Sequence, residues 1–451
     1  MLTGFPLLVL IFIAILFIIV ASSVWKMHPF IALMIATFGV GLAVGMPLPE
    51  IITAINSGFG GLMGYIGLIV IMGSIIGIIL EKSGAAIRIA DLILRLVGKK
   101  RPALAMSLIG ATVSVPVFCD SGFIILSGLN KALAKKTNTK KASLALALAA
   151  GLYTTHTLIP PTPGPIAAAG NIGASNYLGV IMLVGFFVSI PTLLVAWWFA
   201  IRKGKLIETI KEESDFIPDE NLNIPSTIKA LTPILLPILL IGIGSVVQFL
   251  KIESTFGDWM LFLGNPLVAL FIGMLSAFSL LPSFEKTYLN DWIGEGIKLA
   301  GPILIITGAG GAFGGVLKAT PIADLVEGWV SGGQFSGSIF LIITFLIAAL
   351  LKTSQGSSTN ALVITSSMLA PLVVTMGFDT PFELALVVMA LGGGAMTVSH
   401  ANDSYFWVVS QFSGIEMKDA YRSYTLMTGL QGLVVLLITL ILFLLSPLMV
   451  G

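Results

Sequence analysis

The chain has 451 residues, of which 56% are hydrophobic and only 10% are Asp, Glu, Lys or Arg. Soluble proteins carry about 25% charged residues, so this chain cannot cover a water-facing surface and is predicted to be an integral membrane protein. Its net charge of +2 provides no basic field for nucleic acid. The single cysteine, Cys119, excludes an intramolecular disulfide and a cysteine-cluster metal site.

Apolar segments of about 20 residues, long enough to cross a bilayer as a helix, recur along the chain. Ten of them are predicted to be transmembrane helices: 4–24, 28–46, 59–80, 142–160, 177–201, 229–250, 264–282, 299–317, 384–410 and 424–448. Two further apolar segments, 103–130 and 336–376, do not fit a simple span. These patterns predict an all-α polytopic membrane protein surrounded by lipid.

Charged side chains are costly in hydrocarbon, so those within apolar segments are the first functional candidates. Asp120, Lys352 and Asp403 lie deep in apolar sequence, and so do His156 and His400. Each also has a structural explanation. An embedded histidine can be a helix-to-helix hydrogen-bond donor, a lysine can extend to the interface, and an aspartate can mark a misplaced segment end.

Loop charges predict the orientation, because short basic loops lie on the cytoplasmic side. The loop 81–101 has six basic residues against two acids, and 130–141 has five against none, so both are expected inside. The 28 residues of 103–130 must then leave and re-enter on one side, which predicts a re-entrant hairpin. Its tip is expected at 114–122, where Pro116 and Gly122 would break the helix.

The second half repeats motifs of the first. The runs that resemble each other are 77–80 and 314–317, 89–92 and 322–325, and Thr155-His156 and Ser399-His400. A second hairpin is predicted near 336–376, and both its flanking charges and the count of spans place its ends outside. The sequence thus predicts two inverted repeats, 1–201 and 229–451, joined by a cytoplasmic linker at 202–228.

Inverted repeats with broken helices are a recurring plan of secondary transporters, which bind substrate and ion near the midplane. Interruptions are predicted at 114–122, 154–165, 354–360 and 392–404. They combine small or helix-breaking residues with polar ones, which suits a hydroxyl-rich anion. Half-helix N–H groups would bind a carboxylate, and side chains would bind hydroxyls. No cofactor, metal site or nucleotide-binding loop is predicted, so an ion gradient or the substrate gradient supplies the energy.

Two coupling ions fit these residues. Asp120, His156, His400 and Asp403 are candidates to take up and release protons, because burial and neighbouring charge change the pKa of carboxylate and imidazole groups. Sodium bound by carbonyls and hydroxyls at the hairpin tips is the alternative. The residues alone do not separate the two ions.

Four motifs resemble the gluconate permease family, within a larger ion-transporter superfamily of elevator carriers. The motifs are 117–123 (VFCDSGF), 156–165 (HTLIPPTPGP), 355–359 (QGSST) and 399–407 (SHANDSYFW). The resemblance covers essentially the whole chain. It implies a dimeric proton symporter of the cytoplasmic (inner) membrane for gluconate or a related sugar acid, with glycerate and D-serine as alternatives. Its hairpin-containing domain would move against a scaffold.

The resemblance also implies that both hairpin tips and both histidine segments surround the substrate. Lys352 and hairpin N–H groups are expected to bind the carboxylate, and Asp120 or Asp403 with a histidine to couple the proton. The predicted substrate-binding residues are Asp120, Ser121, Gly122, Thr155, His156, Thr157, Lys352, Gln355, Gly356, Ser357, Ser358, Thr359, Ser399, His400 and Asn402. The chain departs from the family pattern at Lys352, usually Arg, at Ser358, usually Ala, and at Asn360. Lysine lacks the bidentate fork of arginine, so its contact with a carboxylate, and with it the preferred substrate, is expected to differ from the family pattern.

Two other classes of function would use some of the same residues. An intramembrane serine hydrolase would use Ser121 with His156 or His400 as its base, about 3 Å away, but does not account for an inverted second copy of the motif. A channel would conduct without saturation, whereas two hairpins from opposite faces favour alternating access.

Overall fold

The computed structural model describes residues 1–98, 101–115, 117–209, 224–250, 252–283, 285–321, 337–400 and 403–450. This part of the chain is helical and contains no strand, as the composition predicted. Four sequence predictions fall wholly or mostly outside it: Pro116, Asn402, the repeat motif at 322–325 and the middle of the linker at 210–223.

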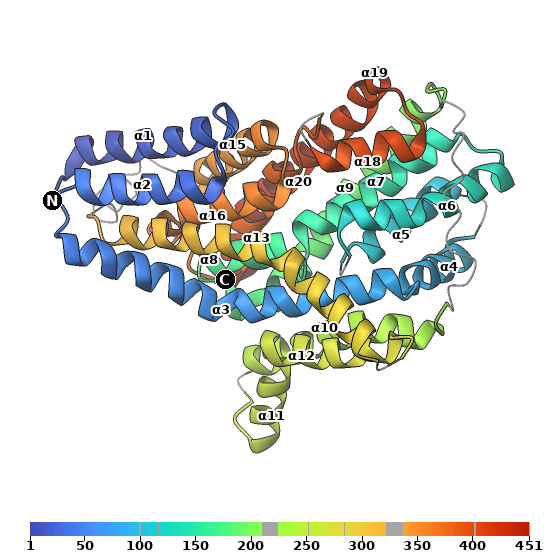
Figure 1. Ribbon diagram of the computed structural model, residues 1–451, viewed down its shortest axis with the longest axis horizontal. Coiled ribbons are helices and arrows are strands. Elements are labelled where there is room, and N and C mark those ends of the chain that lie inside the picture. Colours follow the sequence, from blue (N-terminus) through green and yellow to red (C-terminus); the bar gives the residue numbers. More distant parts are fainter. Residues whose placement is uncertain are drawn as a thin grey trace.

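The helices form one elongated bundle (Figure 1). Those of the first half are α1 (Gly4–Ser23), α2 (Pro29–Ala43), α3 (Leu48–Lys82), α4 (Ala85–Val97), α5 (Pro102–Val113), α6 (Cys119–Thr137), α7 (Lys141–Leu158), α8 (Pro163–Asn171) and α9 (Leu178–Gly204). Those of the second half are α10 (Thr227–Phe249), α11 (Thr255–Gly264), α12 (Pro266–Ala277), α13 (Lys286–Lys318), α15 (Gly337–Gln355), α16 (Ser358–Val373), α17 (Pro381–Met396), α18 (Ser404–Ser413), α19 (Met417–Ala420) and α20 (Leu426–Val450). A π-helical turn at Tyr421–Thr425 precedes α20.

Five helical segments in the described residues are long and apolar enough to cross a membrane, or seven if each of two bent pairs counts as one span. The five are Lys141–Asn171, Ser175–Gly204, Thr227–Gly244, Tyr288–Lys318 and Met417–Ser446. Fewer helices pass this test than the ten spans predicted, because several apolar helices, among them α2 and α17, have only 15 or 16 residues. The protein is a multi-pass membrane protein.

The long helices α3 and α13, one from each half, run side by side through the bundle (Figure 1). Glycines allow this close contact. A Cβ at Gly58 would lie 2.2 Å from the carbonyl oxygen of Gly311, and one at Gly315 would lie 2.5 Å from that of Ala54. Both helices extend beyond the predicted spans at 59–80 and 299–317, because each continues through polar residues that an apolar window excludes.

An exposed ion pair joins the same two helices, with Lys82 of α3 bonded to Glu295 of α13. Their side chains are 33% and 48% exposed, so solvent screens the attraction. We expect Lys82→Ala to change the free energy of unfolding by less than about 1 kcal/mol. Thermal unfolding of the purified variant measures this, and a larger loss would assign Lys82 a further role.

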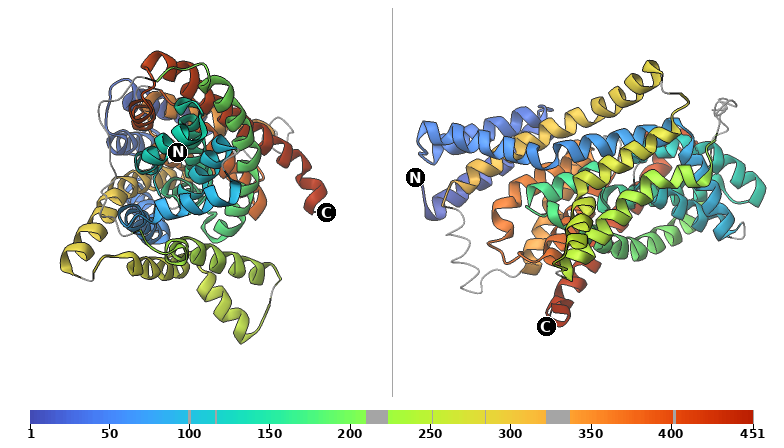
Figure 2. Two further views of the ribbon diagram at one scale, coloured as in Figure 1. Left: turned by 90° about the vertical axis from the view of Figure 1, so that its right-hand side faces the viewer. Right: turned by 90° about the horizontal axis from the view of Figure 1, so that it is seen from below.

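The layer of α10, α11 and α12 packs on α3, α4 and α9 at one side of the bundle. Figure 2 shows this layer projecting from the body, with α11 at its outer end. The layer meets the interior at the α7–α8 break, where Pro160 and Pro161 face residues of α10 and α12.

Both segments predicted as hairpins consist of two helices separated by a short break. The first breaks at 114–118, between α5 and α6, and the second at Gly356-Ser357, between α15 and α16. The first arms pack on comparable helices, α5 on α7 and α15 on α17. The second arms pack both within their own half, α6 on α7 and α16 on α13, and across the halves, α6 on α18 and α16 on α8.

Several residues predicted to interrupt helices lie inside them. Gly122 is in the first turn of α6, and Gly392 and Gly394 are within α17. The reason is tertiary packing: a Cβ at Gly392 would lie 2.5 Å from the carbonyl oxygen of Thr157, and one at Gly394 would lie 2.3 Å from that of Phe345. These glycines therefore permit close contacts and do not end the helix.

Two broken helices replace single predicted segments. The predicted interruption at 154–165 is confined to 159–162, between α7 and α8, so Thr155, His156 and Thr157 are helical. The predicted span at 384–410 is divided into α17, which ends at Met396, and α18, which begins at Ser404. There Val398 has φ +56°, a conformation that β-branched residues rarely adopt.

Candidate functional site

The break between α17 and α18 contacts both hairpin tips. From the first hairpin, Asp120 accepts a hydrogen bond from the Ser404 hydroxyl, with an Oγ to Oδ2 distance of 3.0 Å. From the second hairpin, Lys352 donates to Asp403 over 2.5 Å. The structure thus brings together residues from both hairpins and from the junction of α17 and α18.

Lys352 and Asp403 form a buried ion pair. The Lys352 side chain is 0% exposed and that of Asp403 is 6% exposed. Asp403 caps α18: its Oδ1 accepts from the backbone N–H of Tyr405 at 3.1 Å, and its Oδ2 accepts from Lys352 and the Ser399 hydroxyl. The Lys352 ammonium also donates to the Gly356 carbonyl, 2.8 Å away.

His400 makes a second contact with the end of α15. Its Nε2 lies 2.7 Å from the carbonyl oxygen of Thr353, and because a carbonyl only accepts, Nε2 carries the proton. Nearby, the backbone N–H of Ser399 donates to the Thr428 hydroxyl of α20 at 3.0 Å. Ser399 and His400, which follow α17, are therefore anchored to α20 and α15.

Asp120 lies in the first turn of α6, where the helix dipole favours a negative charge. Its Oδ1 is buried and has no hydrogen-bond partner within the described residues, while its Oδ2 accepts from Ser404. The next residue, Ser121, interacts with the Glu81 carboxylate at the end of α3. Sequence reasoning missed Glu81, because it lies in a basic loop whose charges indicate only the orientation.

His156 is buried in α7, with 4% of its surface exposed. Its Nδ1 has no partner in the described part of the chain, and its ring centre lies 5.7 Å from that of Phe118, just before α6. The hydroxyls of Thr155 and Thr157 donate to carbonyls of their own helix, at 3.4 and 3.1 Å. The imidazole is therefore the polar group of this segment that faces the first hairpin.

The tip of the second hairpin is a tight turn at Gly356, whose φ of +82° favours glycine. Ser357 then caps α16, accepting from the backbone N–H of Asn360 at 3.2 Å. Ser358 is buried, whereas Gln355 and Thr359 are partly exposed. A Cβ at Gly164 would lie 3.7 Å from the Cα of Thr359, so the N-terminal ends of α8 and α16 adjoin.

Three buried tyrosines surround the ion pair and were not among the predicted site residues. The ring centres of Tyr153 and Tyr405 are 5.3 Å apart, and those of Tyr405 and Tyr424 are 5.8 Å apart. The Lys352 Nζ lies 5.8 Å from the centre of the Tyr153 ring. The chain has only seven tyrosines, and the available signal was that Tyr405 lies within the motif at 399–407 and Tyr153 just before the one at 156–165.

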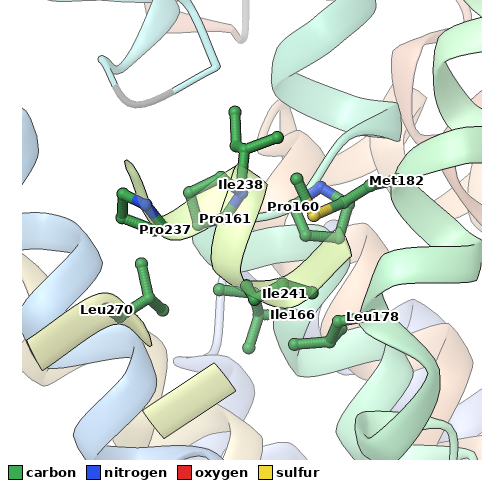
Figure 3. Close-up of a pocket in the computed structure, with 9 residues that line it drawn as sticks. All are labelled: Pro160, Pro161, Ile166, Leu178, Met182, Pro237, Ile238, Ile241 and Leu270. Atoms are coloured by element: carbon green, nitrogen blue, oxygen red, sulfur yellow. The ribbon is translucent and has the colours of Figure 1, made fainter. Parts of the chain in front are cut away.

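A small cleft elsewhere is entirely apolar (Figure 3). It separates the α7–α8 break and α9 from α10 and α12, and is lined by Pro160, Pro161, Ile166, Leu178, Met182, Pro237, Ile238, Ile241 and Leu270. None of these side chains can bind a hydroxyl or a carboxylate. The cleft is therefore a packing gap and not a site for a polar substrate.

The arrangement does not favour a serine hydrolase built on Ser121. This serine interacts with Glu81, and the Nε2 of His400 faces a backbone carbonyl. Within the described residues, neither histidine is hydrogen-bonded to Ser121 as a general base would be.

Interrupted apolar helices that gather charged groups in their interior define the class of this protein as a multi-pass membrane transporter. The sequence pattern that defines the GntP family of permeases matches residues 6–445 of this chain. The chain therefore belongs to the GntP permease family. The resemblance to gluconate permeases seen in the four motifs is thus confirmed.

Two relatives agree with this assignment, and a solved structure shares the fold. A gluconate permease of Pseudomonas aeruginosa is 30% identical over 438 residues, covering 94% of both chains. The inner membrane permease YgbN of Escherichia coli is 32% identical over 432 residues, covering 92% of this chain and 93% of the relative. The YdaH transporter of Alcanivorax borkumensis has a TM-score of 0.61 over 86% of this chain and 88% of its own, at 13% identity, and so shares the fold.

Proposed function

We propose that the protein is a secondary active transporter that carries gluconate or a related small hydroxy-carboxylate with protons across the cytoplasmic (inner) membrane. The family and its gluconate permeases support the substrate class. The observation that carries the proposal is the contact of both hairpin tips with one helix break, through Asp120 and Lys352. Sites built from discontinuous helices are a recurring feature of secondary transporters.

The half-helix N-terminal ends suggest where a carboxylate binds. The ends of α6 and α18 already carry the carboxylates of Asp120 and Asp403. Those of α8 and α16 adjoin and carry no acidic residue in their first turns. Among the first three residues of α8 only Gly164 has a backbone N–H, because Pro163 and Pro165 carry none. The substrate carboxylate would therefore bind mainly at the N-terminal end of α16, where the backbone N–H groups of Ser358 and Thr359 and the helix dipole attract an anion.

The two inverted repeats and the elevator movement also remain proposals. The packing that supports the repeats is reciprocal: α6 of the first half packs on α18 of the second, and α16 of the second half packs on α8 of the first. We further propose a homodimer, on the basis of the family resemblance. In the elevator movement the hairpins and the broken helices would move together, because both hairpins are hydrogen-bonded to residues at the junction of α17 and α18.

Uptake by proteoliposomes that contain the purified protein tests the function. We expect labelled gluconate to accumulate under an inward proton gradient, and unlabelled gluconate to compete. Accumulation that follows a sodium gradient and ignores pH would exclude proton coupling. A panel of gluconate, other sugar acids, glycerate and D-serine defines the substrate, and failure of every sugar acid would contradict the substrate class.

A further inference from the structure

We infer that Lys352 is a positioning residue: its ammonium is held by Asp403 and Gly356, and this link fixes the tip of the second hairpin against the α17–α18 break. In this role Lys352 does not bind the substrate carboxylate directly. For its transport readouts the inference rests on the proposed function, whereas its stability readout is independent of it.

The contacts of Lys352 are internal to the protein. An ammonium group has three donors, and two of them are used by the Asp403 carboxylate and the Gly356 carbonyl, at 2.5 and 2.8 Å. The side chain has no exposed surface, and its Nζ also lies near the ring of Tyr153. One donor remains, but because the ammonium is fully buried a substrate carboxylate could reach it only if the packing around Lys352 opened.

Asp403 is equally occupied. Its Oδ2 accepts from Lys352 and Ser399, and its Oδ1 accepts from the backbone N–H of Tyr405. Because both oxygens bind donors, the carboxylate serves as the counter-ion of Lys352 and as the cap of α18. Asp403 is thus less suited to exchange a coupling ion than Asp120, whose Oδ1 has no partner within the described residues.

The link shapes the hairpin tip itself. The Gly356 N–H donates to the Lys352 carbonyl at 2.8 Å, and the Gly356 carbonyl accepts from the Lys352 ammonium at 2.8 Å. Lys352 therefore binds both backbone polar groups of Gly356, the residue at which the chain turns from α15 toward α16. The residue after Lys352, Thr353, accepts a hydrogen bond from His400 through its carbonyl. Two successive residues of α15 are therefore bonded to the α17–α18 break.

Charge removal distinguishes a link from a substrate ligand. A buried charge that loses its partner is strongly destabilising, whereas replacing both members of a pair by neutral groups is often tolerated. The variants are Lys352→Met, Asp403→Asn and the double variant. Lys318→Met makes the same change at an exposed position and serves as the matched control.

The test measures the melting temperature without ligand, gluconate-dependent thermal stabilisation and gluconate counterflow. We expect each single variant to have a lower melting temperature and a counterflow rate about 100-fold below that of the original protein. The double variant should regain most of the lost melting temperature, and its counterflow rate should be at least about 10-fold higher than that of either single variant. Its KM should lie within about 3-fold of the original value. Lys318→Met should match the original protein.

Two outcomes would overturn the inference. A double variant as unstable as the single variants would show that the pair is not a replaceable link. A double variant that regains its melting temperature but loses gluconate-dependent stabilisation would show that Lys352 contacts the substrate. If the original protein neither binds nor transports any sugar acid, the proposed function fails, while the melting temperatures still decide whether the link exists.

Discussion

Replacing Asp120 with Asn is expected to abolish gradient-driven accumulation of the sugar acid while preserving its binding and exchange. Lys352 neutralises Asp403, so Asp120 is the carboxylate at the meeting point of the tips that has no charged hydrogen-bond partner in the described structure. An anionic substrate would bring a second negative charge. At an effective dielectric constant of 20, two unit charges repel by about 3 kcal/mol at a separation of about 5 Å and still by about 2 kcal/mol at about 10 Å, so a proton on Asp120 would accompany the substrate.

The direction of the pH dependence follows from this role. An asparagine resembles the protonated aspartate, so counterflow in the variant should hardly differ between pH 6 and pH 8. In the original protein, uptake should rise as the outside becomes more acidic. Proteoliposomes with and without a proton gradient measure both effects.

Ser404→Ala provides the control for Asp120. It removes the hydroxyl that donates to Asp120 and keeps the carboxylate, so coupling should persist with less than about a tenfold loss of rate. If Asp120→Asn still accumulates substrate against its gradient, the coupling proton is bound elsewhere, and His156 becomes the first candidate.

The sequence predicted the helical class and the buried polar groups, because both depend on local properties. A long apolar run must be a helix in lipid, and a charge within such a run is costly wherever it lies. Asp120, Lys352 and Asp403 are therefore identifiable from the sequence alone. Their partners are not, since Lys352 and Asp403 are 51 residues apart and Asp120 and Ser404 are 284 apart.

The ends of the broken helices were harder to predict for a related reason. Gly392 and Gly394 carry a weak local preference against helix, but the backbones of α7 and α15 approach them so closely that only glycine fits in α17. Tertiary contact thus overrides the local preference, and the helix continues to Met396. Tyr153 and Tyr424 likewise carry no motif of their own, and only tertiary packing against Tyr405 places them in the polar interior.

Replacing Gly151 with Leu is expected to separate the first hairpin from α7. A Cβ at Gly151 would lie 2.0 Å from the carbonyl oxygen of Ser107 and 2.8 Å from the backbone nitrogen of Ala111, both on α5. On the other helix, a Cβ at Gly110 would lie 2.5 Å from the carbonyl oxygen of Leu148. The colliding atoms are backbone, so no side-chain rotation can relieve the clash.

We expect this substitution to lower the free energy of unfolding by about 3 kcal/mol or more, at the upper end of the usual cost of overpacking. Uptake should fall with it, because α5 carries the tip that places Asp120 near α18. Gly60→Leu in α3 makes the same change where a Cβ would meet no other atom within 4 Å, and should unfold at nearly the original temperature. Equal melting temperatures for the two variants would mean that α5 and α7 can separate without cost, and that the hairpin does not depend on this crossing to present Asp120.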